Sequence, residues 1–259
     1  MKLLFENWRR YVNEAVDYTD HLQDGGKTFY VIDDKGDSGF TVALLQWGGK
    51  REFSTGYDKK GRPTGTIEAP IFKNLGYFLV TRASYTKGEC YKSNETLMKP
   101  SYVKSKAEGK GPILYDLVLS YCKRKGYWFM PDIQAKISDS AKPVWKFYNT
   151  KRKSEIEILQ FDRLENPFTT PDDPKDDCES IVYTTSGGDA ENDQEWLDSP
   201  FTKAYRMNND NLIKHYEQYK VIRITNNRFP AGYLDREELV WHNDEFMLPK
   251  DFQETIYDK

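Results

Sequence analysis

Cysteine and histidine are scarce in this sequence of 259 residues, and both are widely spaced. The three cysteines, Cys90, Cys122 and Cys178, are odd in number and contain no Cys-x-x-Cys pair, which argues against a disulfide scaffold or a zinc ribbon. The three histidines form no His-x-x-x-His or His-Glu-x-x-His pattern. The sequence therefore predicts no metal centre.

Long apolar runs and a strong charge of one sign are also missing. No run approaches the roughly 20 residues that a membrane-spanning helix needs, and the first residues are too polar for a signal peptide. We therefore expect a protein of a cytoplasm with no membrane partner. The net charge of −3 gives no general attraction to nucleic acid. Aromatic residues, at 15%, are plentiful and favour a packed core over disorder.

The first third of the chain alternates between strand patterns and turns. Apolar residues recur at helical spacing over residues 3–18, which predicts an amphipathic helix. Residues 28–32 and 40–47 are rich in β-branched and aromatic residues and flank a turn, which predicts a hairpin. Several glycines and prolines occur in residues 54–66, so a loop is expected there. Residues 76–84 contain the best candidate for a buried strand.

The middle of the chain predicts a strand, a glycine turn, a helix and a second strand. Residues 86–100 are irregular, and a strand is expected near 102–105. A helix then begins at Pro112, because proline suits a first turn whose amides have no partner. Its last turn is rich in lysine and arginine, and Gly126 suits its end. Residues 127–130 are the following short strand.

A second helix and strand follow. Apolar spacing predicts a helix within residues 138–152, and residues 155–162 predict a strand. The acidic residues 165–200 are expected to form a long loop. A calcium loop would need a glycine that is missing among the acids of this segment, Asp189, Glu191 and Asp193.

One segment resembles a known cofactor loop. Lys106-Ala107-Glu108-Gly109-Lys110-Gly111 is similar to the pyrophosphate loop of the GNAT acetyltransferases: a basic residue or glutamine, two residues, glycine, one residue and glycine. A glycine turn before a helix is a general anion site, because free amides and the helix dipole point at the ligand. The resemblance implies that Lys106, Gly109, Lys110 and Gly111 bind acetyl-CoA.

The elements after this loop extend the resemblance. In GNAT folds the next strand splays from its neighbour to admit pantetheine, and the helix after it often offers a tyrosine as general acid for the departing thiolate. Residues 127–130 and Tyr148 stand at those places. The resemblance implies that Tyr148 is catalytic, since a general acid must reach the leaving sulfur. The alternative is that Tyr148 is an ordinary core aromatic on an amphipathic helix.

A longer resemblance covers residues 102–205. It is to an uncharacterised family common in tailed phages, and it implies a phage origin and a GNAT-like fold without naming a substrate. The opening residues 2–11 also resemble the leader helices of marine phage proteins. The elements that are similar to the phage family are Gly109 to Asp116, Met130-Pro131-Asp132, Ser138 to Tyr148, Gln160-Phe161-Asp162, Asp177-Cys178, Trp196 and Ser199 to Tyr205.

The expected fold is therefore α/β in the α+β sense: a mixed, largely antiparallel, GNAT-like sheet with flanking helices. Residues 1–24 are expected to form an N-terminal amphipathic helix, and residues 25–165 the GNAT-like core. Residues 166–259 are expected to form an acidic loop region and a C-terminal extension packed on the core.

Departures from the GNAT pattern leave a second function open. Pro112 removes one amide from the anion site, and Lys106 can contact phosphate only as a point charge. No carboxylate is obvious as a general base, and Glu108, the nearest, lies in the loop itself. The alternative is a non-catalytic phage protein, either a virion component or an inhibitor of a host defence system. It would bind an unknown protein partner through its N-terminal helix, in the host cytoplasm or in the virion.

The deciding feature between these two hypotheses is whether a slot for pantetheine opens between the strand near residues 102–105 and the strand at 127–130. A third hypothesis is an ADP-ribosyltransferase, which would need an arginine, a Ser-x-Ser strand and a Glu-x-Glu pair. Glu155-Ile156-Glu157 supplies the last of these elements alone.

Overall fold

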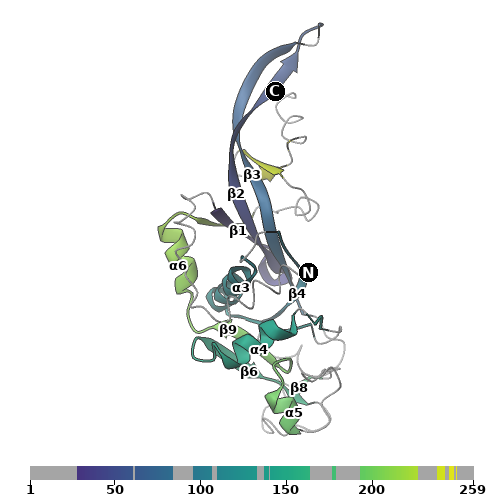
Figure 1. The fold of residues 1–259 in the computed structure, drawn as a ribbon, viewed down its shortest axis with the longest axis vertical. Coiled ribbons are helices and arrows are strands. Elements are labelled where there is room, and N and C mark those ends of the chain that lie inside the picture. Colours follow the sequence, from purple (N-terminus) through teal and green to yellow (C-terminus); the bar gives the residue numbers. More distant parts are fainter. Residues whose placement is uncertain are drawn as a thin grey trace.

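The computed structural model describes residues 28–60, 62–83, 96–106, 110–132, 137–139, 141–163, 177–178, 193–226, 238–242, 245–247 and 249. Most strands lie in one curved sheet whose hydrogen-bonded order is β10-β1-β2-β3-β4-β5-β9-β6 (Figure 1). The elements are β1 (Thr28–Asp34), η1 (Gly36–Ser38), β2 (Gly39–Tyr57), β3 (Pro63–Arg82), β4 (Thr96–Ser105), α3 (Gly111–Lys125), β5 (Tyr127–Phe129), α4 (Lys142–Thr150), β6 (Ile156–Gln160), β7 (Asp162–Arg163), β8 (Asp177–Cys178), α5 (Asp193–Asp198), β9 (Lys203–Met207), α6 (Asn211–Gln218), β10 (Ile222–Thr225), β11 (Glu238–His242) and β12 (Glu245–Met247).

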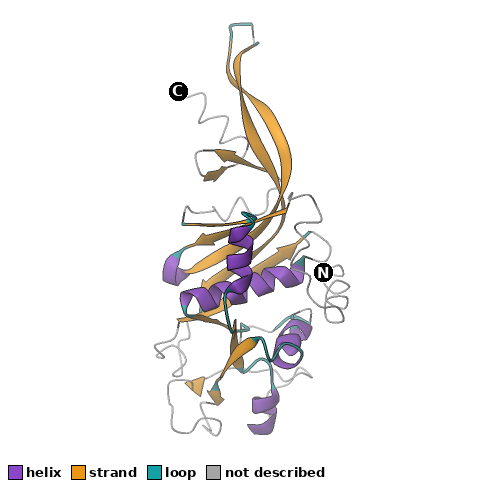
Figure 2. Cartoon of the chain, turned by 90° about the vertical axis from the view of Figure 1, so that its left-hand side faces the viewer, coloured by secondary structure: helices purple, strands orange, loops and turns teal. Residues whose placement is uncertain are grey.

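The fold is mixed α/β with a mostly antiparallel sheet, which confirms the expected class at that level. Strands β1 to β4 form an antiparallel meander, and β9 is antiparallel to both β5 and β6. The β4–β5 and β1–β10 pairs are parallel. Helices α3, α4 and α6 pack with the sheet in one large apolar core, and α3 crosses one face of the sheet (Figure 2).

The turn between β1 and β2 depends on Gly39. Its φ is 139°, a backbone angle that residues other than glycine rarely adopt. A Cβ at this position would lie 2.2 Å from the carbonyl oxygen of Val80 on β3. Strands β1 and β2 pair antiparallel, which confirms the predicted hairpin. Its turn needs glycine because β3 lies close against it.

Helix α3 forms where the sequence predicts it. Pro112 lies in its first turn, and Gly126 ends it with a left-handed φ of 74°. Three basic residues occupy its last turn, where they offset the helix dipole. The residues from Gly111 to Cys122 are all buried, so α3 is a core helix rather than a half-exposed one.

Several later predictions are also confirmed. Helix α4 lies within the predicted range 138–152, and β6 within 155–162. Trp145 of α4 packs on Phe129 of β5, with ring centroids 5.3 Å apart. Helix α6 and strand β10 follow, and Tyr216 of α6 stacks on Tyr30 of β1.

The loop predicted over residues 54–66 is wrong. Strand β2 runs to Tyr57 and β3 starts at Pro63, so the two strands form a long hairpin that projects far from the body (Figure 1). Proline is tolerated there because it is the first residue of its strand. Gly56 and Gly65 belong to the ladder, where they face each other. The irregular stretch predicted at 86–100 likewise ends early, because β4 begins at Thr96.

Residues after position 165 supply part of the central sheet. Strand β9 lies between β5 and β6, and β10 lies beside β1. The acidic region contains the short elements β8 and α5 among its described residues. The predicted helix at residues 3–18 lies outside the described residues. Within the described part, no helix is both long and apolar enough to cross a membrane.

Candidate functional site

Strands β4 and β5 are parallel neighbours that pair over a short length, because β5 ends long before β4 does. They are joined by α3 and pair only between residues 96–98 and 127–129. One more backbone bond follows, from the amide of Met130 to the carbonyl of Met98 at 2.8 Å. Residues 99–105 of β4 continue beside β3, and no pairing with β5 is present there in the described part of the chain.

Two local features accompany the end of this pairing. The register between β3 and β4 shifts once, which leaves Ser101 as an extra residue, and such a bulge bends a strand. On the other side Pro131 follows β5 and has no amide hydrogen to continue the ladder. We call this place, with residues 99–105 on one side and residues 130–131 on the other, the β4–β5 fork. At its base the ammonium of Lys99 pairs with Asp132 at 3.0 Å, so the two sides remain in contact there.

The predicted cofactor loop connects β4 to α3 at the open end of this fork. The amide of Lys106 donates to the carbonyl of Leu75 at 2.6 Å, which holds the end of β4 against β3. Lys110 is the N-cap residue of α3, its side chain makes no capping bond to the helix, and Gly111 is buried at the helix start. Gly109 lies outside the described residues.

The start of α3 is suited to an anion. The first amides of a helix have no partner within it, and the helix dipole adds partial positive charge at the same end. No acidic residue occurs in the first turn of α3 to neutralise that charge. Lys106 and Lys110 add two cations near it, one exposed and one half-buried.

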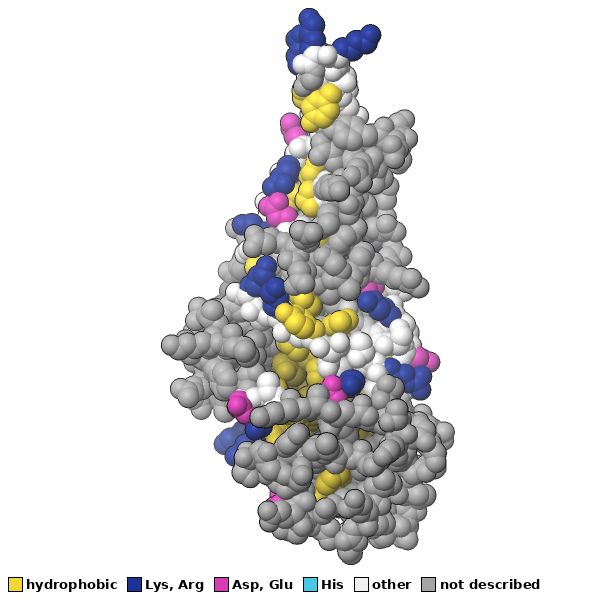
Figure 3. Space-filling view, turned by 90° about the vertical axis from the view of Figure 1, so that its right-hand side faces the viewer, with side chains coloured by type: hydrophobic (Ala, Val, Ile, Leu, Met, Phe, Trp, Pro, Cys, Tyr) yellow, Lys and Arg dark blue, Asp and Glu magenta, His cyan; other side chains and the backbone are white. Residues whose placement is uncertain are grey.

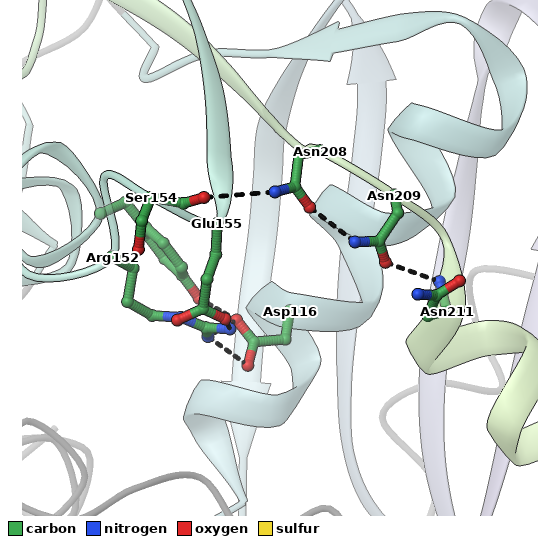
Figure 4. Close-up of polar contacts among 8 residues, drawn as sticks. Asp116, Arg152, Ser154, Glu155, Asn208, Asn209 and Asn211 are labelled. Atoms are coloured by element: carbon green, nitrogen blue, oxygen red, sulfur yellow. Dashed lines mark hydrogen bonds and ion pairs between the residues drawn. The ribbon is translucent and has the colours of Figure 1, made fainter.

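Tyr148, the predicted general acid, is fully buried on α4. Its hydroxyl donates to Oδ1 of Asp116 on α3 at 2.7 Å. The guanidinium of Arg152 donates to both oxygens of the same carboxylate, at 2.6 and 2.7 Å, and also pairs with Glu155 (Figure 4). The hydroxyl of Tyr148 thus has an ionised partner within the core, and this network ties α4 to α3.

Asp116 and Arg152 are the two charged residues of this network that were not predicted from the sequence. Asp116 is completely buried, and only 6% of the Arg152 side chain is exposed. A signal for the pair was present, because Asp116 interrupts an otherwise apolar run in α3. A charged side chain within a buried helix needs a partner of opposite sign. The sequence alone does not identify which lysine or arginine pairs with Asp116.

A second charged cluster fixes the closed end of the fork. The guanidinium of Arg206 lies 3.9 Å from the ring centroid of Trp128 in β5. Arg206 also binds Glu157, which Lys123 at the end of α3 binds as well. Partial burial raises the pKa of Glu157, but the hydrogen bonds from these two cations outweigh it and leave the pKa lowered. The cluster keeps β5, β6 and β9 in place beside α3.

The two acids of the Glu-x-Glu pair are therefore both in ion pairs. Glu155 binds Arg152, and Glu157 binds Arg206 and Lys123. The side chain of Glu155 is 54% exposed, whereas that of Glu157 is 33% exposed. Each is used to hold neighbouring elements together.

Metal-binding groups do not gather anywhere in the described residues: no cluster of three or more histidine, cysteine, aspartate or glutamate side chains could hold an ion there. Cys122 is a free, buried thiol whose pKa is raised by burial. Comparison with protein-family models, with curated proteins and with solved structures finds no match for this chain. The fork and the start of α3 are therefore the basis of the functional assignment.

Proposed function

We propose that this chain has a GNAT-like fold and is an acyl-CoA-dependent N-acyltransferase that holds its cofactor in the β4–β5 fork. The observation that supports this most directly is the fork itself. Pairing between the two parallel strands ends after residues 98 and 129, and the helix that joins them starts beyond that point. A strand pair that stops short in this way leaves room in the sheet for the proposed acyl-CoA site.

The chemistry of coenzyme A fits the two parts of the site. Its pyrophosphate is an anion, which suits the start of α3 with Lys106 and Lys110 beside it. Gly109 and Gly111 would allow the backbone to approach the phosphates closely. Pantetheine is an extended chain with two amides, and residues 99–103 of β4 lie beyond the last residue that pairs with β5.

In the proposed reaction the acceptor amine attacks the thioester carbonyl, the carbon–sulfur bond breaks, and the amine loses one proton to solvent. The departing thiolate gains a proton from a general acid, which we assign to Tyr148, and Tyr148 then regains a proton from solvent. The Tyr148 hydroxyl now donates to Asp116, so it must change partner to reach the sulfur. Asp116 and Arg152 would then position the ring rather than react.

The test is a calorimetric titration with acetyl-CoA, using charge variants in pairs. Lys106→Glu/Lys110→Glu reverses two charges at the mouth of the fork. Lys146→Glu/Lys153→Glu makes the same change in net charge at exposed positions in and just after α4. Wild type and the second variant should bind with micromolar affinity, and the first should bind at least about tenfold more weakly. Absence of binding by the folded wild type would end the acyltransferase proposal.

A second candidate is a non-catalytic phage protein that binds a partner, in the host cytoplasm or as part of the virion. The observation in its favour is that the Tyr148 hydroxyl is held by Asp116 inside the core. Tyr148→Phe separates the two. An acyltransferase should lose kcat while its KM for acetyl-CoA is unchanged, whereas a binding protein has no turnover to lose. The resemblance to a tailed-phage family supports a phage origin for either function.

A further inference from the structure

The hairpin of β2 and β3 continues as a two-stranded arm beyond the other strands of the sheet. Near the body one face of the arm is buried, where Phe53 and Ala69 pack with Val240 of β11. Strand β1 covers β2 as far as Gln46, and β11 covers β3 at residues 71–73. From Lys50 to Tyr57 the described part of the arm has no further strand beside it (Figure 2). At about 3.3 Å for each residue, this stretch spans about 26 Å.

The outer half of the arm is unusually thin. Residues 54–56 and 64–66 are all serine, threonine or glycine. A Cβ at Gly56 would lie 2.7 Å from the hydroxyl oxygen of Thr64, and one at Gly65 would lie 2.6 Å from that of Thr55. Threonine on each strand therefore occupies the space that glycine leaves on the other. The result is a narrow ribbon that exposes hydroxyl groups.

Positive charge is concentrated at the end of this ribbon. Asp58 accepts hydrogen bonds from the backbone amides of Lys60 and Arg62, which closes the turn. The side chains of Lys59 and Lys60 are exposed, and neither has an acidic partner among the described residues. Figure 3 shows lysine and arginine side chains gathered at this end of the molecule.

The cations nearer the body are already neutralised. Lys50 binds Glu68 at 2.8 Å, and Arg51 binds Glu238 of β11 at 3.0 Å. At the tip Arg62 pairs with Asp58 at 3.7 Å, so the uncompensated charge of the arm lies on Lys59 and Lys60. Because the tip is about 26 Å from the body and the Debye length is about 10 Å in 0.1 M salt, the net negative charge of the whole chain is screened there.

We propose that this arm binds double-stranded DNA by entering the major groove. The major groove of B-form DNA, about 12 Å wide, admits a two-stranded β-ribbon. A ribbon of threonine, serine and glycine is narrow enough to lie in the groove, and Lys59 and Lys60 at its end then reach the phosphates along the edge of the groove. Most contacts go to phosphate oxygens, so the arm binds DNA with little sequence preference. This function is independent of the β4–β5 fork.

The test is fluorescence anisotropy with a labelled 30-base-pair DNA duplex at several salt concentrations. Two lysines on phosphates give a slope of log K against log salt of about −1.8. Lys59→Glu/Lys60→Glu should weaken binding at 50 mM salt at least about tenfold and bring the slope close to zero, because both phosphate contacts are lost. Lys146→Glu/Lys153→Glu changes the net charge equally at a distant place and should bind as wild type does.

Two comparison ligands decide whether the groove matters. A-form RNA has a deep, narrow major groove that a ribbon cannot enter, so an RNA duplex of equal length should bind more weakly than DNA. Polyglutamate offers charge without a groove and should bind weakest. The proposal is overturned if the folded wild type does not bind DNA at 50 mM salt. It is also overturned if the two control lysines matter as much as the tip lysines, or if RNA or polyglutamate binds as tightly as DNA.

Discussion

Replacement of Asp116 by asparagine should be one of the most damaging isosteric changes in this protein. The Asp116 side chain is wholly buried, and its two oxygens accept from Arg152 and Tyr148. Asparagine keeps the shape but leaves the buried guanidinium facing an amide, with Glu155 as its remaining acid. Removing one partner of a buried ion pair costs about 3–5 kcal/mol. That is a large share of the roughly 5–15 kcal/mol by which a domain is stable.

Urea unfolding followed by circular dichroism measures this loss. Tyr148→Phe removes one hydrogen bond to a charged group and should cost about 1.5–3 kcal/mol. Glu155→Gln removes the half-exposed acid of the same network and should cost under about 1 kcal/mol. The double variant Asp116→Asn/Tyr148→Phe should be more stable than additivity predicts, because the two changes remove one shared bond. If Asp116→Asn costs less than about 1 kcal/mol, the network does not link α3 to α4 as described.

Three further results are expected. Gly39→Ala should cost at least about 2 kcal/mol in urea unfolding, because its Cβ would lie 2.2 Å from the Val80 oxygen. Gly36→Ala, with open space around it, should cost about 1 kcal/mol. Equal losses of stability in the two variants would contradict this. In a Cys90→Ser/Cys178→Ser background, Cys122 should react with a thiol reagent at pH 8 only on unfolding, since burial raises its pKa; rapid labelling of the native protein would show an open core. Burial lowers the pKa of Lys203 from 10.5 to about 8 in the folded state, so between these two pH values the unfolded state binds more protons than the folded state. Stability should therefore rise with pH just above 8. A rise that persists unchanged in Lys203→Met would belong to another group.

The middle of the chain was the most predictable part because local signals agree there. Pro112, the apolar run of α3, its basic last turn and Gly126 all indicate one helix, and the structure has it. The arm was missed for the opposite reason. Glycine, proline and threonine in residues 54–66 are typical of a loop, and only the pairing across the hairpin makes them a ribbon. That pairing joins residues on two strands, and local propensity does not contain it.

The candidate site was also only partly predictable. The glycine turn and the helix start are adjacent in sequence, so a pattern can find them. The fork depends on a bulge at Ser101 and on the short length of β5, which are properties of pairing between strands. The partner of Tyr148 could not be predicted either, because Asp116 lies 32 residues away and meets it only when α3 and α4 pack.

Hydrogen exchange with and without acetyl-CoA is the measurement that tests the proposed site most directly. If the cofactor lies in the β4–β5 fork, it should slow exchange at amides of residues 99–106 and 110–114, while the arm is unchanged. Protection confined to other segments, or none at saturating acetyl-CoA, would contradict the assignment of the fork as an acyl-CoA site.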